Sequence, residues 1–267
     1  MTQPPTPSTG SITYQVTQGV ARLVIDQPQR MNAMNLDMWQ SLPLCLAKAE
    51  ADPAVRVITL EGADDKAFCA GADISQFGAQ RSTPEAVKSY EVAVTEGNRA
   101  LQHVGKPTVA IIRGICFGGG FGLAMCCDLR FARADARFRI PAARLGLGYA
   151  YGGIELLYRK LGMAPVADLL LSARILAADE ALRLGIVQSV HADDFEHAVE
   201  SQIARMAGNA PLTLQAVKRA LVELAKPESQ RDSAAVDQLV ANCFASADYQ
   251  EGQSAFREKR DPVFKGE

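Results

Sequence analysis

Two stretches of the 267-residue chain share a design that strongly limits its fold. In each, an apolar run is followed by a glycine-containing loop and a second apolar segment. The first joins VRVITLEG, residues 55–62, to AFCAGADI, residues 67–74. The second joins VAIIRG, residues 109–114, to ICFGGGFGLA, residues 115–124. Short apolar runs bounded by glycine are typical of fully buried strands, and each loop is expected to lead into a helix.

The glycines of these loops admit two interpretations. Glycine reaches backbone dihedrals that are closed to other residues and lets a ligand approach closely. Free N–H groups at a helix entry are oriented donors, so two of them aimed at one point would form an oxyanion hole. Alternatively, the glycines only permit close packing of helix on sheet. The triplet at 118–120 is not followed by Lys-Ser or Lys-Thr and does not match GxGxxG, which excludes a phosphate loop and a dinucleotide site.

The remaining pattern alternates strands and helices over the first two thirds of the chain and is helical afterwards. ITYQVT and VARLVID, joined by Gln-Gly, predict a hairpin over residues 12–26. Asn35 is expected to cap a helix over residues 36–52, which Pro43 should disturb, and another helix is expected over 85–104. This order indicates an α/β core with a helical C-terminal region.

Composition excludes several classes of function. The net charge of −2 leaves no overall electrostatic footprint for nucleic acid or an anionic membrane, although RSTPEAVK or FREKRDP could contribute to a local basic patch. The six cysteines contain no CxxC pair and are expected to be reduced core thiols, and His103, His191 and His197 do not group as metal ligands. Residues 1–11 predict a disordered tail without the regions of a signal peptide, and no apolar run reaches the roughly 18 residues that span a bilayer. A cytoplasmic protein is expected.

Taken together, the motifs AFCAGADI, AIIRGICFGGGFGLAMCCDLRFA and ADEALRLGIV closely resemble the crotonase, or enoyl-CoA hydratase/isomerase, superfamily. The similarity runs from about residue 12 to 264 and includes QPQRMNAMN and DYQEGQSAFREKRDPVF. It implies an α/β fold with a crotonase-type ββα spiral core at 12–200, which carries the acyl-CoA site. It also implies a C-terminal helical trimerisation region at 201–267. The expected assembly is a homotrimer or a dimer of trimers.

The resemblance also assigns site residues by motif position. Members polarise an acyl-CoA thioester with two backbone N–H groups, which here would belong to Ala72 and Gly119. No cofactor is implied, because coenzyme A enters as part of the substrate. The positions that would contact the acyl-CoA, the last two often from a neighbouring subunit, are Arg30, Ala33, Met34, Ala70, Asp73, Ile74, Phe256 and Lys259.

The chain departs from the hydratases of this family at two positions. Those enzymes use a pair of glutamates as general acid and base. The resemblance places the first at Gly122 and the second at Ala142, so neither position carries a carboxylate. Asp128 and Glu155 do not restore the pair by a simple register shift. An enoyl-CoA hydratase-like lyase is expected by similarity, without the usual mechanism.

The loop LGLGYAYGGIELL offers a different catalytic group. Tyr149 matches the tyrosine of the methylmalonyl-CoA decarboxylase branch, which also lacks both glutamates, although that branch has histidine at the position of Ala72. Decarboxylation needs no base to form the enolate, and a tyrosine hydroxyl can donate a proton or hydrogen bond. Tyr149 and Tyr151 could instead only wall the acyl site, and Arg144 could pair with an acidic acyl substituent or form a surface ion pair.

Three functions therefore stay open: an enoyl-CoA hydratase-like lyase, a decarboxylase-like acyl-CoA enzyme that uses Tyr149, and a non-catalytic acyl-CoA-binding protein. The third would keep the donor loops for binding alone. An RNA-binding role, which has precedent in the family, is disfavoured because the chain lacks a helix rich in Lys and Arg.

Overall fold

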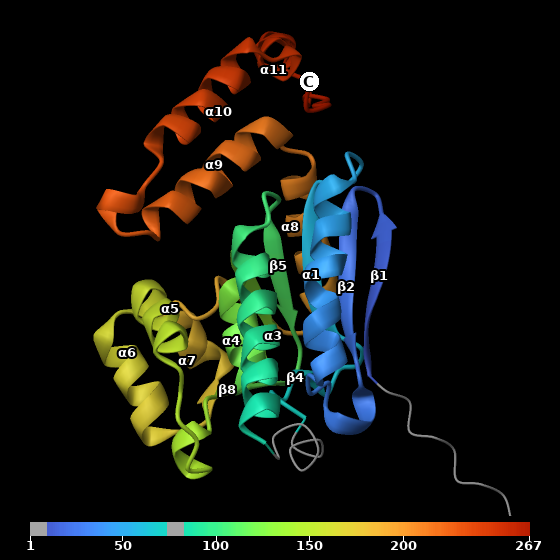
Figure 1. Ribbon diagram of the computed structural model, residues 1–267. Helices are drawn as coiled ribbons and strands as arrows, with labels where there is room; N and C mark the ends of the chain where they lie inside the picture. The colour runs from blue at the N-terminus through green and yellow to red at the C-terminus, as the bar shows by residue number, and fades with distance from the viewer. Residues whose placement is uncertain (1–9, 74–82) are drawn as a thin grey trace, which may run out of the picture.

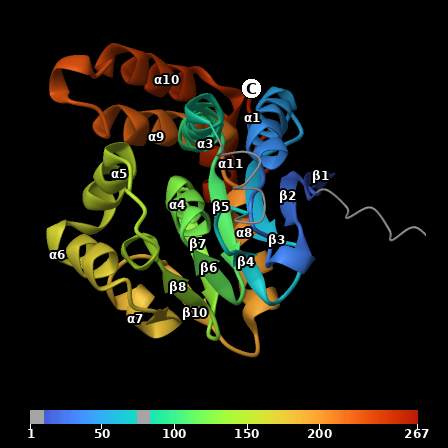
Figure 2. The same ribbon diagram turned by 60° about the horizontal axis from the view of Figure 1, so that its bottom comes forward.

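The computed structural model describes residues 10–73 and 83–267. Its strands form two sheets, which Figures 1 and 2 show from two sides. The strands of the six-stranded sheet, in spatial order, are β1 (Ser11–Thr17), β2 (Val20–Asp26), β3 (Val57–Gly62), β5 (Thr108–Ile112), β7 (Leu129–Arg133) and β10 (Ser189–His191). Those of the four-stranded sheet are β4 (Ala67–Cys69), β6 (Ile115–Phe117), β8 (Arg137–Arg139) and β9 (Leu176–Ala177).

The helices cover the sheets and form the C-terminal region. The α-helices are α1 (Leu36–Ala51), α3 (Pro84–His103), α4 (Gly119–Cys126), α5 (Tyr151–Leu161), α6 (Met163–Ala167), α7 (Ala178–Arg183), α8 (Phe195–Ala207), α9 (Pro211–Leu224), α10 (Ser233–Ala245) and α11 (Ala247–Glu258). The short 3-10 helices are η1 (Pro28–Arg30), η3 (Ala142–Arg144) and η5 (Glu228–Gln230), and η4 (Asp168–Ser172) is a π-helix.

The two sheets are built from repeated strand–strand–helix units. β3, β5 and β7 lie parallel in the large sheet, and each is followed by a short strand, β4, β6 or β8, in the small sheet. α3 follows the first pair and α4 the second. This repeat is the expected ββα spiral, so the α/β fold class is confirmed. Both glycine loops follow small-sheet strands, which places the loops at neighbouring strand ends.

Helices bury both faces of the large sheet. Trp39, Leu42 and Leu46 of α1 pack into the main core together with the Phe121 and Phe138 side chains of α4 and β8. On the other side, α8 contacts strand residues through a second cluster (Val20, Val57, Val109, Ile111, Phe131, Phe195, Val199 and Ile203). Burial on both faces explains why the central strands read as continuous apolar runs.

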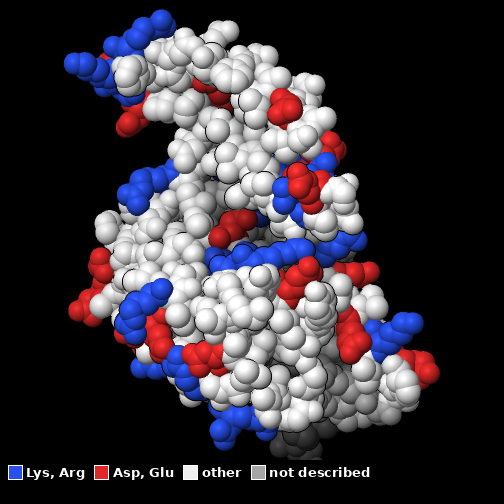
Figure 3. All heavy atoms as spheres, turned by 90° about the vertical axis from the view of Figure 1, so that its left-hand side faces the viewer, with Lys and Arg blue, Asp and Glu red and all other residues white. Residues whose placement is uncertain are grey.

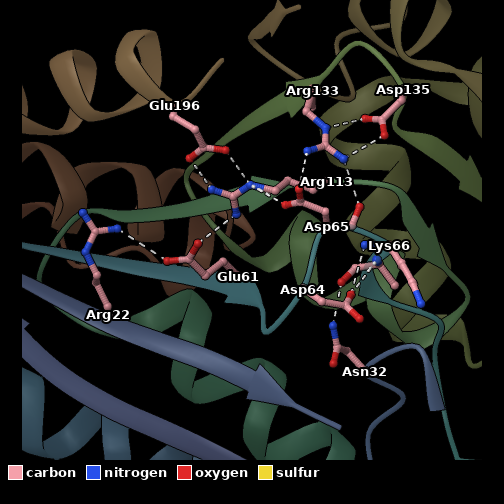
Figure 4. A network of polar contacts seen from close by, with 11 residues as sticks. Arg22, Asn32, Glu61, Asp64, Asp65, Lys66, Arg113, Arg133, Asp135 and Glu196 are labelled. Carbon is pink, nitrogen blue, oxygen red and sulfur yellow. Dashed lines mark hydrogen bonds and ion pairs between the residues drawn. The ribbon is translucent and has the colours of Figure 1, made fainter. Parts of the chain in front are cut away.

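An ion-pair network also fastens α8 to the sheet (Figure 4). Arg113, which follows β5, donates to Glu61 of β3 at 2.9 Å and to Glu196 of α8 at 2.8 Å. Arg133, at the end of β7, lies 3.1 Å from Asp65. The arginines are mostly buried, and each has a carboxylate partner, so the network holds strand ends and helix together without leaving an unpaired charge there.

Most local expectations are confirmed, and one is wrong. The hairpin turns at Gln18 and Gly19, both at positive φ, and the Asn35 side chain accepts from the Met38 N–H at 2.8 Å to cap α1. Pro43 does not disturb α1, which runs unbroken through it. The helix continues because residues on both sides of the proline, such as Trp39 and Leu46, are buried in the core and stabilise it.

The N-terminal tail can be followed only in part. Residues 1–9 of the expected tail lie outside the described residues, while Gly10 is buried and Ser11 already begins β1. All six cysteines are free thiols, and four of them, Cys69, Cys116, Cys126 and Cys127, are buried. No described helix is long and apolar enough to cross a membrane.

The C-terminal helices α9, α10 and α11 form a region set apart from the spiral core in Figure 1. Figure 3 shows that the surface is hollowed between this region and the core, with acidic and basic side chains in the hollow. Lys218 of α9 spans the connection, because its ammonium lies 2.7 Å from both carboxylate oxygens of Asp128. Asp128 also accepts from the backbone N–H and hydroxyl of Thr108 at 2.8 and 3.0 Å.

We expect Lys218→Ala to lower the free energy of unfolding by about 2 kcal/mol. The Lys218 side chain is 4% exposed and that of Asp128 26%, so the substitution leaves a largely buried carboxylate without its counter-ion. The loss stays below that of a fully buried pair because Asp128 keeps both bonds from Thr108. Urea unfolding at fixed protein concentration measures it.

Arg183→Ala is the matched control. Arg183 pairs with Asp179 at 2.8 Å on α7, but both side chains are about two-thirds exposed. Such surface pairs contribute less than about 0.5 kcal/mol. Equal losses in the two variants would contradict the argument that burial makes the Lys218 pair important.

Candidate active site

The first glycine loop is paired through its backbone with the segment at residues 30–34. The Met34 N–H donates to the Gly71 carbonyl at 2.7 Å, and the Asp73 N–H donates to the Met34 carbonyl at 3.0 Å. The Ala70 N–H donates to the Met31 carbonyl at 3.0 Å. The structure therefore brings together the two segments that the resemblance expects to contact the acyl-CoA.

This pairing fixes the direction of the Ala72 N–H. In a trans peptide, the carbonyl of Gly71 and the N–H of Ala72 point opposite ways. Because Met34 holds the carbonyl, the Ala72 N–H faces away from Met34, and it has no acceptor among the described residues. Gly71 adopts φ +109°, and a Cβ there would lie 3.2 Å from the Gly119 nitrogen, so only glycine suits this position.

The second loop delivers another free N–H beside the first. Gly118, at φ +52°, turns the chain into α4, and its N–H donates to the Arg139 carbonyl at 2.8 Å. Gly119 is the first residue of α4, where an N–H has no acceptor within the helix. A Cβ at Gly119 would lie 3.7 Å from the Ala72 nitrogen. Two unpaired donors from separate loops thus lie side by side, an arrangement able to bind one anionic oxygen.

The two loops are in direct contact, which keeps the donors at this spacing. A Cβ at Gly120 would lie 2.3 Å from the Cys69 carbonyl oxygen and 2.7 Å from the Cys69 Cβ. No side chain can therefore separate the first turn of α4 from the end of β4. The glycines serve close packing as well as donor placement, so the two sequence interpretations are compatible at this triplet.

Tyr149 lies beside the position where the family's first glutamate is expected. A Cβ at Gly122 would lie 3.6 Å from the Tyr149 hydroxyl oxygen, while a Cβ at Gly153 would lie 2.8 Å from the Cε1 atom of the ring. The ring therefore rests on the bare backbone of α5. Burial raises the pKa of Tyr149 to about 12, with a smaller contribution from Cys126. The hydroxyl stays protonated and has no hydrogen-bond partner among the described residues.

The position of the second expected glutamate lies close to the same loops. Ala142 begins η3 directly after Pro141, whose Cδ would lie 3.7 Å from a Cβ at Gly118. Arg144 ends η3 and is exposed, and Tyr151, the first residue of α5, is 80% exposed. Of the two tyrosines, only Tyr149 is packed against the core.

The remaining residues of the first loop and its partner segment differ in exposure. Arg30 is exposed, whereas Ala33 and Met34 are buried. Asp73 is also buried, and its carboxylate accepts from the Gln27 side-chain amide at 2.9 Å, so this contact braces the loop. Ile74 lies outside the described residues.

The two expected contacts at the C-terminal end belong to a different region of the chain. Phe256 of α11 is 86% exposed, and Lys259 ends that helix at positive φ. Phe256 lines a cavity among α9, α10 and α11 rather than the glycine loops. The single chain therefore does not bring them to Ala72 and Gly119.

Two residues that shape the site, Cys69 and Gly153, were not predicted from the sequence. The sequence predicts Cys69 only as a core thiol, yet its sulfur contacts the Gly71 backbone N–H at 3.4 Å and carbonyl at 3.6 Å. Gly153 makes room for the Tyr149 ring. The contact of Cys69 with Gly71 could have been inferred from their two-residue separation. Nothing in the sequence indicated that Gly153 makes room for Tyr149.

The histidines lie elsewhere in the fold. His103 ends α3 and contacts the Arg99 carbonyl at 2.8 Å, His191 ends β10, and His197 lies on α8. Over residues 10–73 and 83–267, no group of three His, Cys, Asp or Glu side chains could hold a metal ion.

Comparisons with known proteins agree on one family. The family model described as enoyl-CoA hydratase/isomerase matches residues 15–267. A crotonyl-CoA hydratase from Syntrophomonas wolfei is 32% identical over 255 residues, covering 95% of this chain and 97% of that protein. A short-chain-enoyl-CoA hydratase from Clostridium acetobutylicum is 32% identical over 242 residues, with 90% and 92% covered. The crystal structure of an enoyl-CoA hydratase/carnithine racemase from Magnetospirillum magneticum has a TM-score of 0.91 at 33% identity and 96% coverage of both chains.

Proposed function

The chain belongs to the enoyl-CoA hydratase/isomerase family, and on that premise we propose that it is an acyl-CoA lyase that stabilises a thioester enolate. The oxygen of that enolate would accept hydrogen bonds from the N–H groups of Ala72 and Gly119. The observation that carries the proposal is the placement of these two unpaired donors side by side on separate loops.

Donors fixed before the reaction stabilise charge that develops in the transition state without a cost of reorganisation. A thioester has little resonance protection, so its carbonyl readily takes up this charge. The chain supplies the hole from its own backbone, and coenzyme A enters as part of the substrate. The residues that would contact the acyl-CoA are Arg30, Ala33, Met34, Ala70, Asp73 and Ile74, with Phe256 and Lys259 from a neighbouring copy.

Hydration, the reaction in the names of the two relatives, needs groups that position water and transfer protons. Gly122 and Ala142 provide none, and the group next to Gly122 is the neutral hydroxyl of Tyr149. A phenol that stays protonated can donate a proton but cannot act as a general base. The site is thus better suited to a reaction that makes the enolate without removing a proton.

Decarboxylation of a malonyl-type thioester is such a reaction, and the position of the Tyr149 hydroxyl beside Gly122 favours it. The bond between the α-carbon and its carboxylate breaks, and the electron pair moves into the thioester carbonyl as carbon dioxide leaves. The enolate oxygen is held by Ala72 and Gly119. The Tyr149 hydroxyl then gives its proton to the α-carbon and regains one from solvent, so the net reaction consumes one proton.

Parallel assays of crotonyl-CoA hydration and of malonyl-CoA and methylmalonyl-CoA decarboxylation test this proposal. We expect decarboxylation to be faster than hydration. Rapid hydration of crotonyl-CoA would contradict the argument from Gly122 and Ala142 while leaving the oxyanion hole intact. Tight binding of all three thioesters without turnover would favour the non-catalytic acyl-CoA-binding protein.

We also propose a cytoplasmic homotrimer or dimer of trimers. A cavity of about 700 Å³ among α9, α10 and α11 has a largely apolar lining, and Phe244 and Phe256 there are 63% and 86% exposed. Such a surface suits burial against another copy. A monomer in analytical ultracentrifugation at micromolar concentration would contradict the assembly.

A further inference from the structure

Cys69, the last residue of β4, lies between the two loops that carry the donors. Its side chain is fully buried. Its sulfur accepts from the Gly71 N–H at 3.4 Å and its S–H donates to the Gly71 carbonyl at 3.6 Å. On its other side, its Cβ and carbonyl oxygen contact the Gly120 backbone of α4. One residue thus touches both loops.

The Gly71 carbonyl belongs to the same peptide unit as the Ala72 N–H. Its direction is held by the Met34 N–H at 2.7 Å and by the Cys69 thiol. A rotation of this peptide unit would move the Ala72 donor away from Gly119. Gly71 has no side chain to resist such a rotation. Because glycine adopts many backbone conformations readily, contacts with neighbouring residues are needed to hold its φ at +109°.

We propose that Cys69 is a positioning residue for the oxyanion hole, in which its thiol hydrogen bonds fix the Gly71–Ala72 peptide so that the Ala72 N–H points to the substrate oxygen. This inference rests on the proposed function, because it gives Cys69 a role only if Ala72 is a donor to the thioester.

The state of the thiol is consistent with this role. Burial raises the pKa of Cys69 to about 12, against smaller opposite effects of backbone hydrogen bonds from Gly71 and Met34. The S–H proton therefore remains in place at neutral pH and is available to the carbonyl. Thiol hydrogen bonds are weak in water. In the buried interior, however, loss of the Cys69 thiol leaves the Gly71 carbonyl with one hydrogen-bond donor fewer.

Cys116 provides a matched comparison. It is the register partner of Cys69 on the neighbouring strand β6 and is equally buried. The structure gives its thiol no hydrogen bond to the described backbone of either loop. Substitution of Cys116 therefore removes a similar volume from the same layer of the core without touching the Gly71 peptide.

The experiment measures carbonyl polarisation directly by infrared difference spectroscopy of butyryl-CoA labelled with ¹³C at the thioester carbonyl. Hydrogen bonds to a carbonyl lower its stretching frequency. We expect the full-length protein to lower the band, Cys69→Ala to lose most of that shift, and Cys69→Ser to restore it. Cys116→Ala should keep the wild-type shift, and the affinity for free coenzyme A should be unchanged in all variants. Should Cys69→Ala not fold, Cys69→Val, which suits a strand and fills the space, takes its place.

The other possible results distinguish a failure of the positioning role of Cys69 from a failure of the proposed oxyanion hole. A full shift in Cys69→Ala would overturn the positioning role and leave the oxyanion hole standing. A loss that Cys69→Ser does not reverse, or that Cys116→Ala shares, would assign the effect to packing and also overturn it. A wild-type protein that leaves the carbonyl band unshifted would overturn the proposed oxyanion hole and this inference with it.

Discussion

Gly119→Pro is expected to lower kcat by about 10²–10³-fold in whichever acyl-CoA reaction the wild-type chain catalyses. Proline lacks the N–H that Gly119 would offer to the enolate oxygen. It should nevertheless be tolerated in the fold, because Gly119 is the first residue of α4 and its N–H takes no part in the helix. Gly118 precedes it at φ +52° and ψ −118°, outside the α region that proline disfavours in the preceding residue. Steady-state kinetics, with circular dichroism as a check of helix content, measure the effect.

Gly119→Ala is the control that keeps the donor. The nearest atoms to a Cβ at this position lie at 3.7 Å, which is an ordinary contact, and Gly119 is not at positive φ. Alanine should therefore leave kcat within a few-fold of the wild type. Equal losses in both variants would indicate that bulk, rather than the missing N–H, causes the defect, and the oxyanion-hole assignment at Gly119 would fail.

Local sequence signals predicted most of the fold because they act over short distances. The Asn35 cap, the hairpin turn at Gln18 and Gly19, and the buried strand before each glycine loop depend on neighbouring residues only. The disturbance of α1 expected at Pro43 was wrong for the complementary reason. Whether a proline ends a helix depends on the tertiary packing around it, and the buried face of α1 outweighs the lost hydrogen bond.

Part of the candidate site was also predictable from the sequence. Motif positions predicted that the loops with Ala72 and Gly119 would meet, and the backbone contacts agree with that meeting. Gly122 of α4 and Tyr149 of the loop before α5 lie close together in the structure, and their spacing in the sequence does not predict this proximity. The sequence shows that Gly122 has no side chain, but only the structure shows that the Tyr149 hydroxyl lies beside this position.

Tyr149→Phe should lower kcat by about 10²-fold and leave the affinity for acyl-CoA within a few-fold of the wild type. The substitution removes only the hydroxyl next to Gly122 and keeps the ring on the α5 backbone. If the hydroxyl donates a proton in the transition state, its loss affects turnover rather than binding. Calorimetric titration with butyryl-CoA and steady-state kinetics separate the two quantities. Wild-type turnover in this variant would leave Tyr149 as a wall of the site.

The pH profile adds a second test of the same donor. The hydroxyl must be protonated to act, and burial raises its pKa to about 12 from the ordinary tyrosine value of 10.0. The protonated form therefore persists to higher pH than in an exposed tyrosine, and turnover should stay level through about pH 10. A decline in kcat centred below this pH that is absent in Tyr149→Phe would show that the hydroxyl titrates in its ordinary range and contradict the buried donor.

The two glycines that open α5 show whether the position of the hydroxyl matters as well as its presence. A Cβ at Gly153 would lie 2.8 Å from the Tyr149 ring, so Gly153→Ala should displace the ring and reduce kcat although the hydroxyl is still there. A Cβ at Gly152 meets nothing within 4 Å, so Gly152→Ala places the same methyl group on the same helix turn without contact. If the two alanine variants are equally active, a fixed tyrosine is not required. If only Gly153→Ala is impaired, activity depends on a proton donor that glycine backbone holds beside Gly122, the position at which the family resemblance predicts a glutamate.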